Sequence, residues 1–129
     1  MKQPDPPIPR PRLLDRTLQY IEEAPVTVLL GARQTGKTTL SQMVAHAVIK
    51  NRGMNVHTFD LERAASRAAL SSTPEITLEG LKGLITIDEI QRVPQLFETL
   101  RPLADRPETP ARFLVLGSAS PGLVRGVSE

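Results

Sequence analysis

A chain of 129 residues, 40% of them hydrophobic and 23% charged, has the size and composition of one globular domain. Its net charge of +2 and 3% aromatic content give little basis for nucleic-acid binding by bulk attraction or base stacking. The absence of cysteine excludes disulfides and thiolate metal sites. The apolar run Val26–Leu30 is too short for a signal-peptide core or a membrane span, so we expect a cytoplasmic protein with no membrane partner.

Prolines set the start of the chain apart from the rest. Five of the first eleven residues are proline, which prevents regular pairing, so residues 1–10 are predicted to be a flexible tail. A polyproline ligand for a partner is the alternative interpretation. From Pro11 to about Glu23 the one-sided apolar spacing predicts a helix that opens the domain, residues 11–129. Pro25 ends this helix and precedes a strand, Val26–Leu30.

Beyond that strand, helical and strand patterns alternate. The predicted helices are one that ends at Gly53, one over residues 61–81 in two pieces with Thr73 as the N-cap between them, and one opened by Pro94. The predicted strands are Asn55–Asp60, Leu84–Ile87 and Arg112–Leu116. Strands that alternate with helices predict an α/β fold, in which a parallel sheet carries helices on both faces.

A glycine-rich segment joins the first strand to the next helix, with the sequence Gly31-Ala32-Arg33-Gln34-Thr35-Gly36-Lys37-Thr38. A strand, a loop of this kind and a helix together form a cradle for nucleotide phosphates, and a bland turn is a poor alternative in this context. Gly31 and Gly36 stand where a Cβ would hinder the turn or the approach of phosphate. The helix that starts near Lys37 adds unpaired N–H groups and the positive end of its dipole. Lys37 is predicted to reach the β- and γ-phosphates, and the Thr38 hydroxyl to bind Mg²⁺.

Two carboxylates, Asp88 and Glu89, follow the apolar strand Leu84–Ile87. Because consecutive strand residues point to opposite sides, we expect the two carboxylates to have different roles. Asp88 is predicted to hold Mg²⁺ opposite Thr38, and Glu89 to polarise the attacking water. A helix cap and a solvated charge are the alternative. Ser118, just past the last strand, is the polar group predicted to touch the γ-phosphate or the water, and a turn-forming serine is its alternative.

Other polar residues carry weaker predictions. Arg125 is a candidate arginine finger for a neighbouring subunit, with plain surface as the alternative. Arg33 and Gln34 either contact the nucleotide or a partner, or face solvent. His46 and His57 have no His, Cys or carboxylate at a convincing ligand spacing, so both are predicted to be structural.

Three segments in this order resemble a prokaryotic family of AAA-type ATPases. They are Gly31–Leu40 (GARQTGKTTL), Ile87–Pro94 (IDEIQRVP) and Gly117–Pro121 (GSASP). The family carries a G-P-R-Q-x-G-K-T-T loop, a D-E-I-Q acidic motif and a G-S-S/A-S turn. Ala32 stands where the family commonly has proline. This departure leaves the phosphate contacts untouched. The resemblance covers residues 10–129.

The resemblance implies a three-layer α/β/α P-loop NTPase fold with a mainly parallel sheet, with ATP and Mg²⁺ as cofactors. By likeness, Asp88 and Glu89 form the Walker B motif and Ser118 is sensor 1. The Walker A loop, which binds the nucleotide, comprises Gly31, Ala32, Arg33, Gln34, Thr35, Gly36, Lys37, Thr38 and Thr39. Lys37, Glu89 and Ser118 are then the catalytic residues, and Thr38 and Asp88 the metal ligands.

Family members continue further, through a fifth strand, a helical lid and a carboxy-terminal domain. The implied strand order is 5-1-4-3-2, so without a fifth strand Val26–Leu30 becomes an apolar sheet edge, prone to pairing or aggregation. We therefore expect this chain, with about four strands, to be a fragment. Less stability than a longer version and feeble ATP hydrolysis are the expected consequences.

Mg²⁺-dependent ATP hydrolysis is the leading functional prediction. A non-catalytic ATP- or ADP-binding module is the second, and a nucleic-acid motor is the third, prompted by the helicase-like string Asp88–Gln91 and disfavoured by low charge. GTP is disfavoured because the chain has no Asn-Lys-x-Asp string, and a small-molecule kinase because Glu89 adjoins Asp88. ATP or ADP is the predicted partner, and a homo-oligomer or a protein partner stays open.

Overall fold

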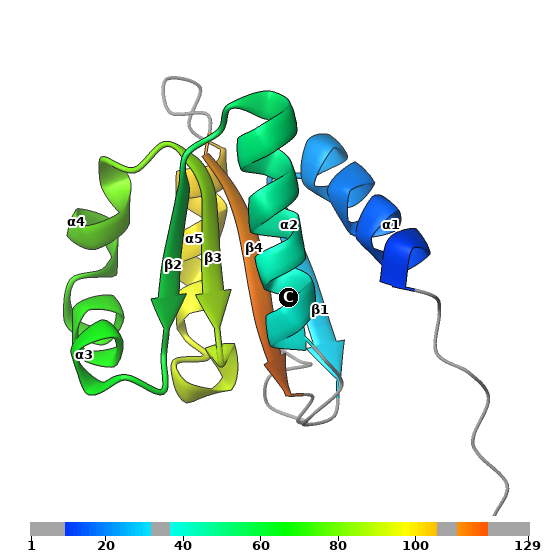
Figure 1. Ribbon diagram of the computed structural model, residues 1–129. Helices are drawn as coiled ribbons and strands as arrows, with labels where there is room; N and C mark the ends of the chain where they lie inside the picture. The colour runs from blue at the N-terminus through cyan, green and yellow to red at the C-terminus, as the bar shows by residue number, and fades with distance from the viewer. Residues whose placement is uncertain (1–9, 32–36, 106–110, 119–129) are drawn as a thin grey trace, which may run out of the picture.

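The computed structural model describes residues 10–31, 37–105 and 111–118. Helices and strands alternate along this part of the chain, as the sequence predicts (Figure 1). In chain order the elements are α1 (Arg10–Glu23), β1 (Val26–Gly31), α2 (Lys37–Arg52), β2 (Val56–Asp60), α3 (Ala64–Ser72), α4 (Pro74–Glu79), β3 (Gly83–Asp88), the 3-10 helix η1 (Ile90–Arg92), α5 (Leu96–Ala104) and β4 (Ala111–Ser118). The predicted tail, residues 1–10, lies outside the described residues except for Arg10, which begins α1.

The four described strands form one sheet in the order β1-β4-β3-β2, and every neighbouring pair is parallel. The α/β class and the predicted order of these four strands are therefore confirmed. Because the strands are parallel, their carboxyl-terminal ends lie along the same end of the sheet, at the bottom of Figure 1. In the described part of the chain, β1 and β2 are the two outer strands.

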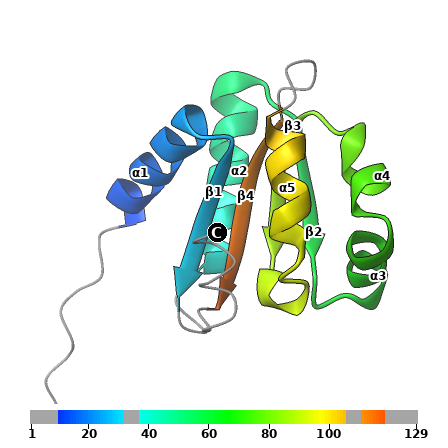
Figure 2. The same ribbon diagram turned by 180° about the vertical axis from the view of Figure 1, so that it is seen from behind.

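Helices cover both faces of the sheet. Helices α1 and α2 lie on one face, and α5, with α3 and α4 beside it, lies on the other (Figures 1 and 2). The alternation along β3 decides which side chain meets which layer: Leu84 packs with the residues of α1 and α2, while Ile85 and Ile87 pack with those of α5. All three are fully buried, and each such side chain contributes about 1.5–3 kcal/mol through removal from water.

The amphipathic faces of the helices agree with the sequence predictions. In α2 the buried residues Leu40, Val44 and Val48 recur with helical spacing. The helix ends before Gly53, as predicted, and Gly53 has a φ of +62°, which glycine adopts without strain. The buried residues of α5 are Leu96, Phe97, Leu100 and Leu103, which lie on one face of the helix.

The break between α3 and α4 falls where proline predicts it, but its capping differs from the prediction. Thr73 occupies the N-cap position and Pro74 the first helical position of α4. The Thr73 side chain makes no capping hydrogen bond, because its hydroxyl donates to the carbonyl of Ala69 in the preceding helix (3.3 Å). Thr73 therefore closes α3 rather than opening α4 through its side chain.

The outer strand β1 borders an apolar groove on the α5 side of the sheet. The groove has a volume of about 260 Å³, and it is lined by Val26, Val28, Phe97, Leu100 and Arg101. Within the described residues, β1 has β4 as its neighbour on one side and no strand on the other. None of the helices in the described part of the chain has the length and apolar character needed to span a membrane.

Candidate nucleotide-binding site

Three strands bring candidate site residues to the carboxyl-terminal end of the sheet. Gly31, the last residue of β1, is paired in register with Ser118, the last residue of β4. Asp88 ends β3, which is the other neighbour of β4. Helix α2 begins at Lys37, a short connection after Gly31, so its amino terminus faces the same end of the sheet. A ligand at this end meets the termini of one helix and three strands.

Several predicted site residues fall outside the part that is described. Residues 32–36 and Arg125 belong to undescribed segments, and the side chains of Lys37 and Thr38 are likewise outside the description. The backbones of Lys37 and Thr38 form the first turn of α2, and Thr39 is exposed on that helix. The structure thus describes Gly31, Thr39, Asp88, Glu89 and Ser118 of the predicted set in full.

Asp88 lines a polar pocket between α2, β2 and α3. The pocket has a volume of about 450 Å³, and its lining residues are Ser41, Gln42, Ala45, Thr58, Asp60, Arg63, Ser66 and Asp88. Asp88 is half-buried, and its Oδ1 accepts a hydrogen bond from the backbone N–H of Glu89 (2.9 Å). A half-buried carboxylate at a strand end, beside the first turns of α2, has the chemistry of a ligand for a hard cation.

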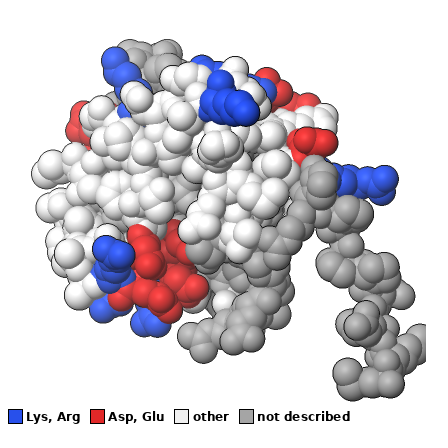
Figure 3. Space-filling model, in the orientation of Figure 1, with Lys and Arg blue, Asp and Glu red and all other residues white. Residues whose placement is uncertain are grey.

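Asp60 is a site candidate that the sequence interpretation did not single out. It ends β2 and is the register partner of Asp88, so two carboxylates stand side by side at the strand ends. Asp60 Oδ1 accepts the backbone N–H of Glu62 (3.0 Å), which fixes the turn into α3. In Figure 3, acidic side chains gather at the part of the surface where β2 and β3 end, with basic groups at the margin. Two carboxylates side by side supply oxygen atoms of the kind that hard cations bind.

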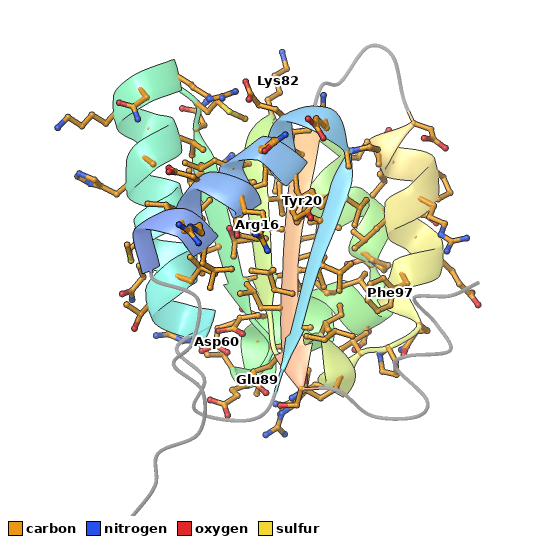
Figure 4. All side chains as sticks on the ribbon, turned by 90° about the vertical axis from the view of Figure 1, so that its right-hand side faces the viewer. Arg16, Tyr20, Asp60, Lys82, Glu89 and Phe97 are labelled. Atoms are coloured by element: carbon orange, nitrogen blue, oxygen red, sulfur yellow. The ribbon has the colours of Figure 1, made fainter. Side chains whose placement is uncertain are left out.

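Glu89 adopts a backbone conformation that its sequence position did not predict. The strand ends at Asp88, and Glu89 lies beyond it with φ 62° and ψ 45°, in the left-handed region. The argument that strand alternation separates Asp88 from Glu89 was therefore wrong, because the turn sets the direction of Glu89. Glu89 is the one non-glycine residue with positive φ in the described part of the chain. Figure 4 shows Glu89 and Asp60 at the same end of the sheet, opposite Lys82.

Gln91 connects Glu89 to the end of β4. Its Nε2 donates a hydrogen bond to Glu89 Oε2, and its Oε1 accepts the backbone N–H of Ser118 (3.1 Å). Sequence interpretation quoted Gln91 within the acidic motif but gave it no role. A periodic pattern in the sequence cannot predict this contact, because Gln91 and Ser118 are 27 positions apart.

The histidines take no part in this site. His46 is exposed on α2, and His57 is half-buried on β2. Across the described ranges, no group of three or more His, Cys, Asp or Glu side chains is arranged to hold a metal ion.

Comparison with known families identifies the chain. The model of a family described as "AAA domain" matches residues 23–129. This chain is an AAA domain. The resemblance seen in the sequence is thereby confirmed at the level of the family.

Two curated mycobacterial proteins are similar to this AAA domain. They are the uncharacterized proteins Rv2008c of Mycobacterium tuberculosis and Mb2031c of Mycobacterium bovis, each 50% identical over 114 residues. The matched region covers 88% of this chain and 24% of each relative. The AAA domain described here thus spans about a quarter of the length of these relatives.

Solved structures support the fold. Domain III of the replication initiation protein DnaA of Thermotoga maritima matches with a TM-score of 0.61 and 16% identity, over 91% of this chain and 58% of that one. PCH-2 of C. elegans matches with a TM-score of 0.55 and 14% identity, over 91% of this chain and 40% of that one. At such low identity these likenesses establish the shared architecture.

Proposed function

We propose that this AAA domain binds ATP with Mg²⁺ and hydrolyses it. The observation that carries the proposal is the convergence, at one end of the sheet, of the end of β1 and the start of α2 with Asp88 at the end of β3. The glycine-rich segment joins β1 to α2 in the sequence. Family membership supports the same function, because the matched region includes all three segments.

In this proposal the phosphates lie against the amino terminus of α2. The backbone N–H groups from Gly31 to Thr39 surround them, and the helix dipole favours their negative charge. Lys37 binds the β- and γ-phosphates as a cation. Ser118, in register with Gly31, contacts the γ-phosphate or the attacking water from the neighbouring strand. The glycine-rich segment and β4 thus bind one ligand from two sides.

The position of Asp88 supports a Mg²⁺ ion at the same place, with Thr38 as the proposed second ligand. Asp88 is half-buried and lines the polar pocket beside α2, and Thr38 belongs to the first turn of that helix. A carboxylate and a hydroxyl, completed by water, are a usual protein contribution to Mg²⁺. When bound, the ion would neutralise charge on the phosphate oxygens.

Glu89 is the proposed general base. It follows Asp88 just beyond the end of β3, and it is half-buried. From there it would accept a proton from the water that attacks the γ-phosphate, a role that contributes about 10²–10⁴-fold to rate. The hydrogen bond from Gln91 restricts its position.

Two measurements separate binding from turnover. Calorimetry with ATP and Mg²⁺ is expected to show Lys37→Ala binding at least ~100-fold weaker than the parent, because a charged phosphate contact is lost. Lys50→Ala is the matched control, since Lys50 is exposed in the last turn of the same helix, and it should bind normally.

A phosphate-release assay then tests Glu89. Glu89→Gln is expected to bind ATP normally and to lose about 100-fold or more in turnover. Glu98→Gln, an exposed position in α5, is the control and should keep full turnover. ATP binding without turnover in the parent chain would replace the hydrolase by a nucleotide-binding module, and absence of binding would refute both.

A further inference from the structure

We propose that Gln91 is a positioning residue that holds the carboxylate of Glu89 and couples it to the backbone at Ser118. This inference rests on the proposed function, because it assigns to Gln91 a role in placing the proposed base. Gln91 itself is not proposed to touch the nucleotide.

The Gln91 amide has one partner at its donor group and another at its acceptor oxygen. Its NH₂ group donates to Glu89 Oε2, and its carbonyl oxygen accepts the N–H of Ser118 at 3.1 Å. A carboxylate can only accept and a backbone N–H can only donate, so one planar amide satisfies both.

Packing around Gln91 keeps the bridge in place. Ile90, the preceding residue, is fully buried in the core beneath η1. Gly117 lies against both residues: a Cβ at this position would approach Ile90 Cγ2 to 2.6 Å and Gln91 Oε1 to 2.7 Å. The close approach of β4 to η1 therefore depends on the absence of a side chain at Gly117. The Gln91 amide is thus held between the carboxylate of Glu89 on one side and the end of β4 on the other.

The backbone of Glu89 adds a reason for such a bridge. Its left-handed conformation is strained for a side chain with a Cβ, and strained residues persist where their surroundings hold them. Gln91 binds the far end of the same residue, only two positions later in the chain. Movement of the backbone at Ser118, the end of β4, would pass to Glu89 through one side chain. The γ-phosphate contact proposed for Ser118 and the base would then respond together.

Turnover by Gln91 variants of the full chain tests this role. Gln91→Ala should lower kcat roughly 10- to 100-fold, because the base loses its fixed position, while the affinity for ATP measured by calorimetry stays within about twofold. Gln95→Ala is the matched control, since Gln95 is exposed just before α5, and it should leave both values unchanged. Equal turnover of Gln91→Ala and the parent would overturn the proposal.

Gln91→Glu distinguishes positioning from a general packing role. It keeps the acceptor for Ser118 and the length of the side chain, but it replaces the donor to Glu89 by a second carboxylate. Its kcat should therefore fall at least as far as that of Gln91→Ala, because neighbouring like charges repel. A kcat close to that of the parent would contradict the proposed donor role.

A structural readout keeps this proposal separable from the proposed function. Hydrogen exchange of the Ser118 amide, followed by NMR, should be at least about tenfold faster in Gln91→Ala than in the parent, and unchanged in Gln95→Ala. If the parent shows no turnover, the proposed function fails, and the bridge is judged by exchange alone. Faster exchange then supports the bridge, and equal exchange overturns it.

Discussion

The strained backbone at Glu89 predicts an inverted order of stability between alanine and glycine. In ordinary positions glycine is the worse residue, because it loses more conformational freedom on folding. At Glu89, with φ 62° and ψ 45°, a residue with a Cβ costs about 1–2 kcal/mol, which glycine avoids. The entropy that glycine loses offsets about 0.5–1 kcal/mol of this gain. Glu89→Gly should therefore be more stable than Glu89→Ala by about 0.5–1 kcal/mol.

This comparison is clean because both variants remove the same carboxylate and the same hydrogen bond with Gln91. Urea denaturation followed by circular dichroism gives the two free energies of unfolding. The control pair is Glu98→Gly and Glu98→Ala, in the first turn of α5, where glycine should be the less stable by about 1 kcal/mol. If Glu89→Ala proved as stable as Glu89→Gly, or more so, the assignment of strain to Glu89 would be wrong.

Two further pairs of variants test the packing of the sheet, each by urea denaturation. Thr86→Val should raise the free energy of unfolding by about 1 kcal/mol, since the buried Thr86 hydroxyl has no hydrogen-bond partner in the described structure. Thr17→Val should lower the free energy of unfolding by about 1 kcal/mol, because the Thr17 hydroxyl, as buried as that of Thr86, donates to the backbone carbonyl of Leu13 (2.8 Å). Equal effects of the two variants would argue against this reasoning. Gly83→Ala should lower the free energy of unfolding by more than about 3 kcal/mol, because φ at Gly83 is +92° and a Cβ would collide with the backbone oxygen of Asn55. Gly53→Ala has positive φ but open space around the new Cβ, so it should cost only about 1 kcal/mol, and a similar loss in both glycine variants would refute the collision.

The sequence predicted the arrangement of the sheet because its signals are local and repeated. The apolar run around Leu84–Ile87 is a buried strand, and Gly53 ends the helix before β2, as the pattern indicates. The ends of the strands were predicted less accurately, because β4 reaches Ser118, beyond the predicted range Arg112–Leu116. Pairing with β1 extends that strand, since Gly31 and Ser118 are partners, and pairing is a property of the sheet rather than of the segment.

The site was predictable in outline and not in its contacts. The positions of Gly31, Asp88 and Ser118 at one end of the sheet follow from strand ends and parallel pairing. The left-handed turn at Glu89 did not follow, because glutamate carries no preference for that conformation and the motif reads as a continued strand. The Gln91 bridge depends on the register between η1 and β4, which arises only when the whole sheet is assembled.

The order of the strands has a consequence for synthesis on the ribosome. Strand β4 lies between β1 and β3, yet it is the last of the described strands to be made. At ordinary elongation rates of about 5–20 residues per second, the nascent β1 waits roughly 4–16 s for its partner. Strands β2 and β3 need no such delay, because they neighbour each other in both sequence and space. The half of the sheet that leads into the glycine-rich loop therefore folds late, and its apolar strand is exposed to chaperones and to other chains until then.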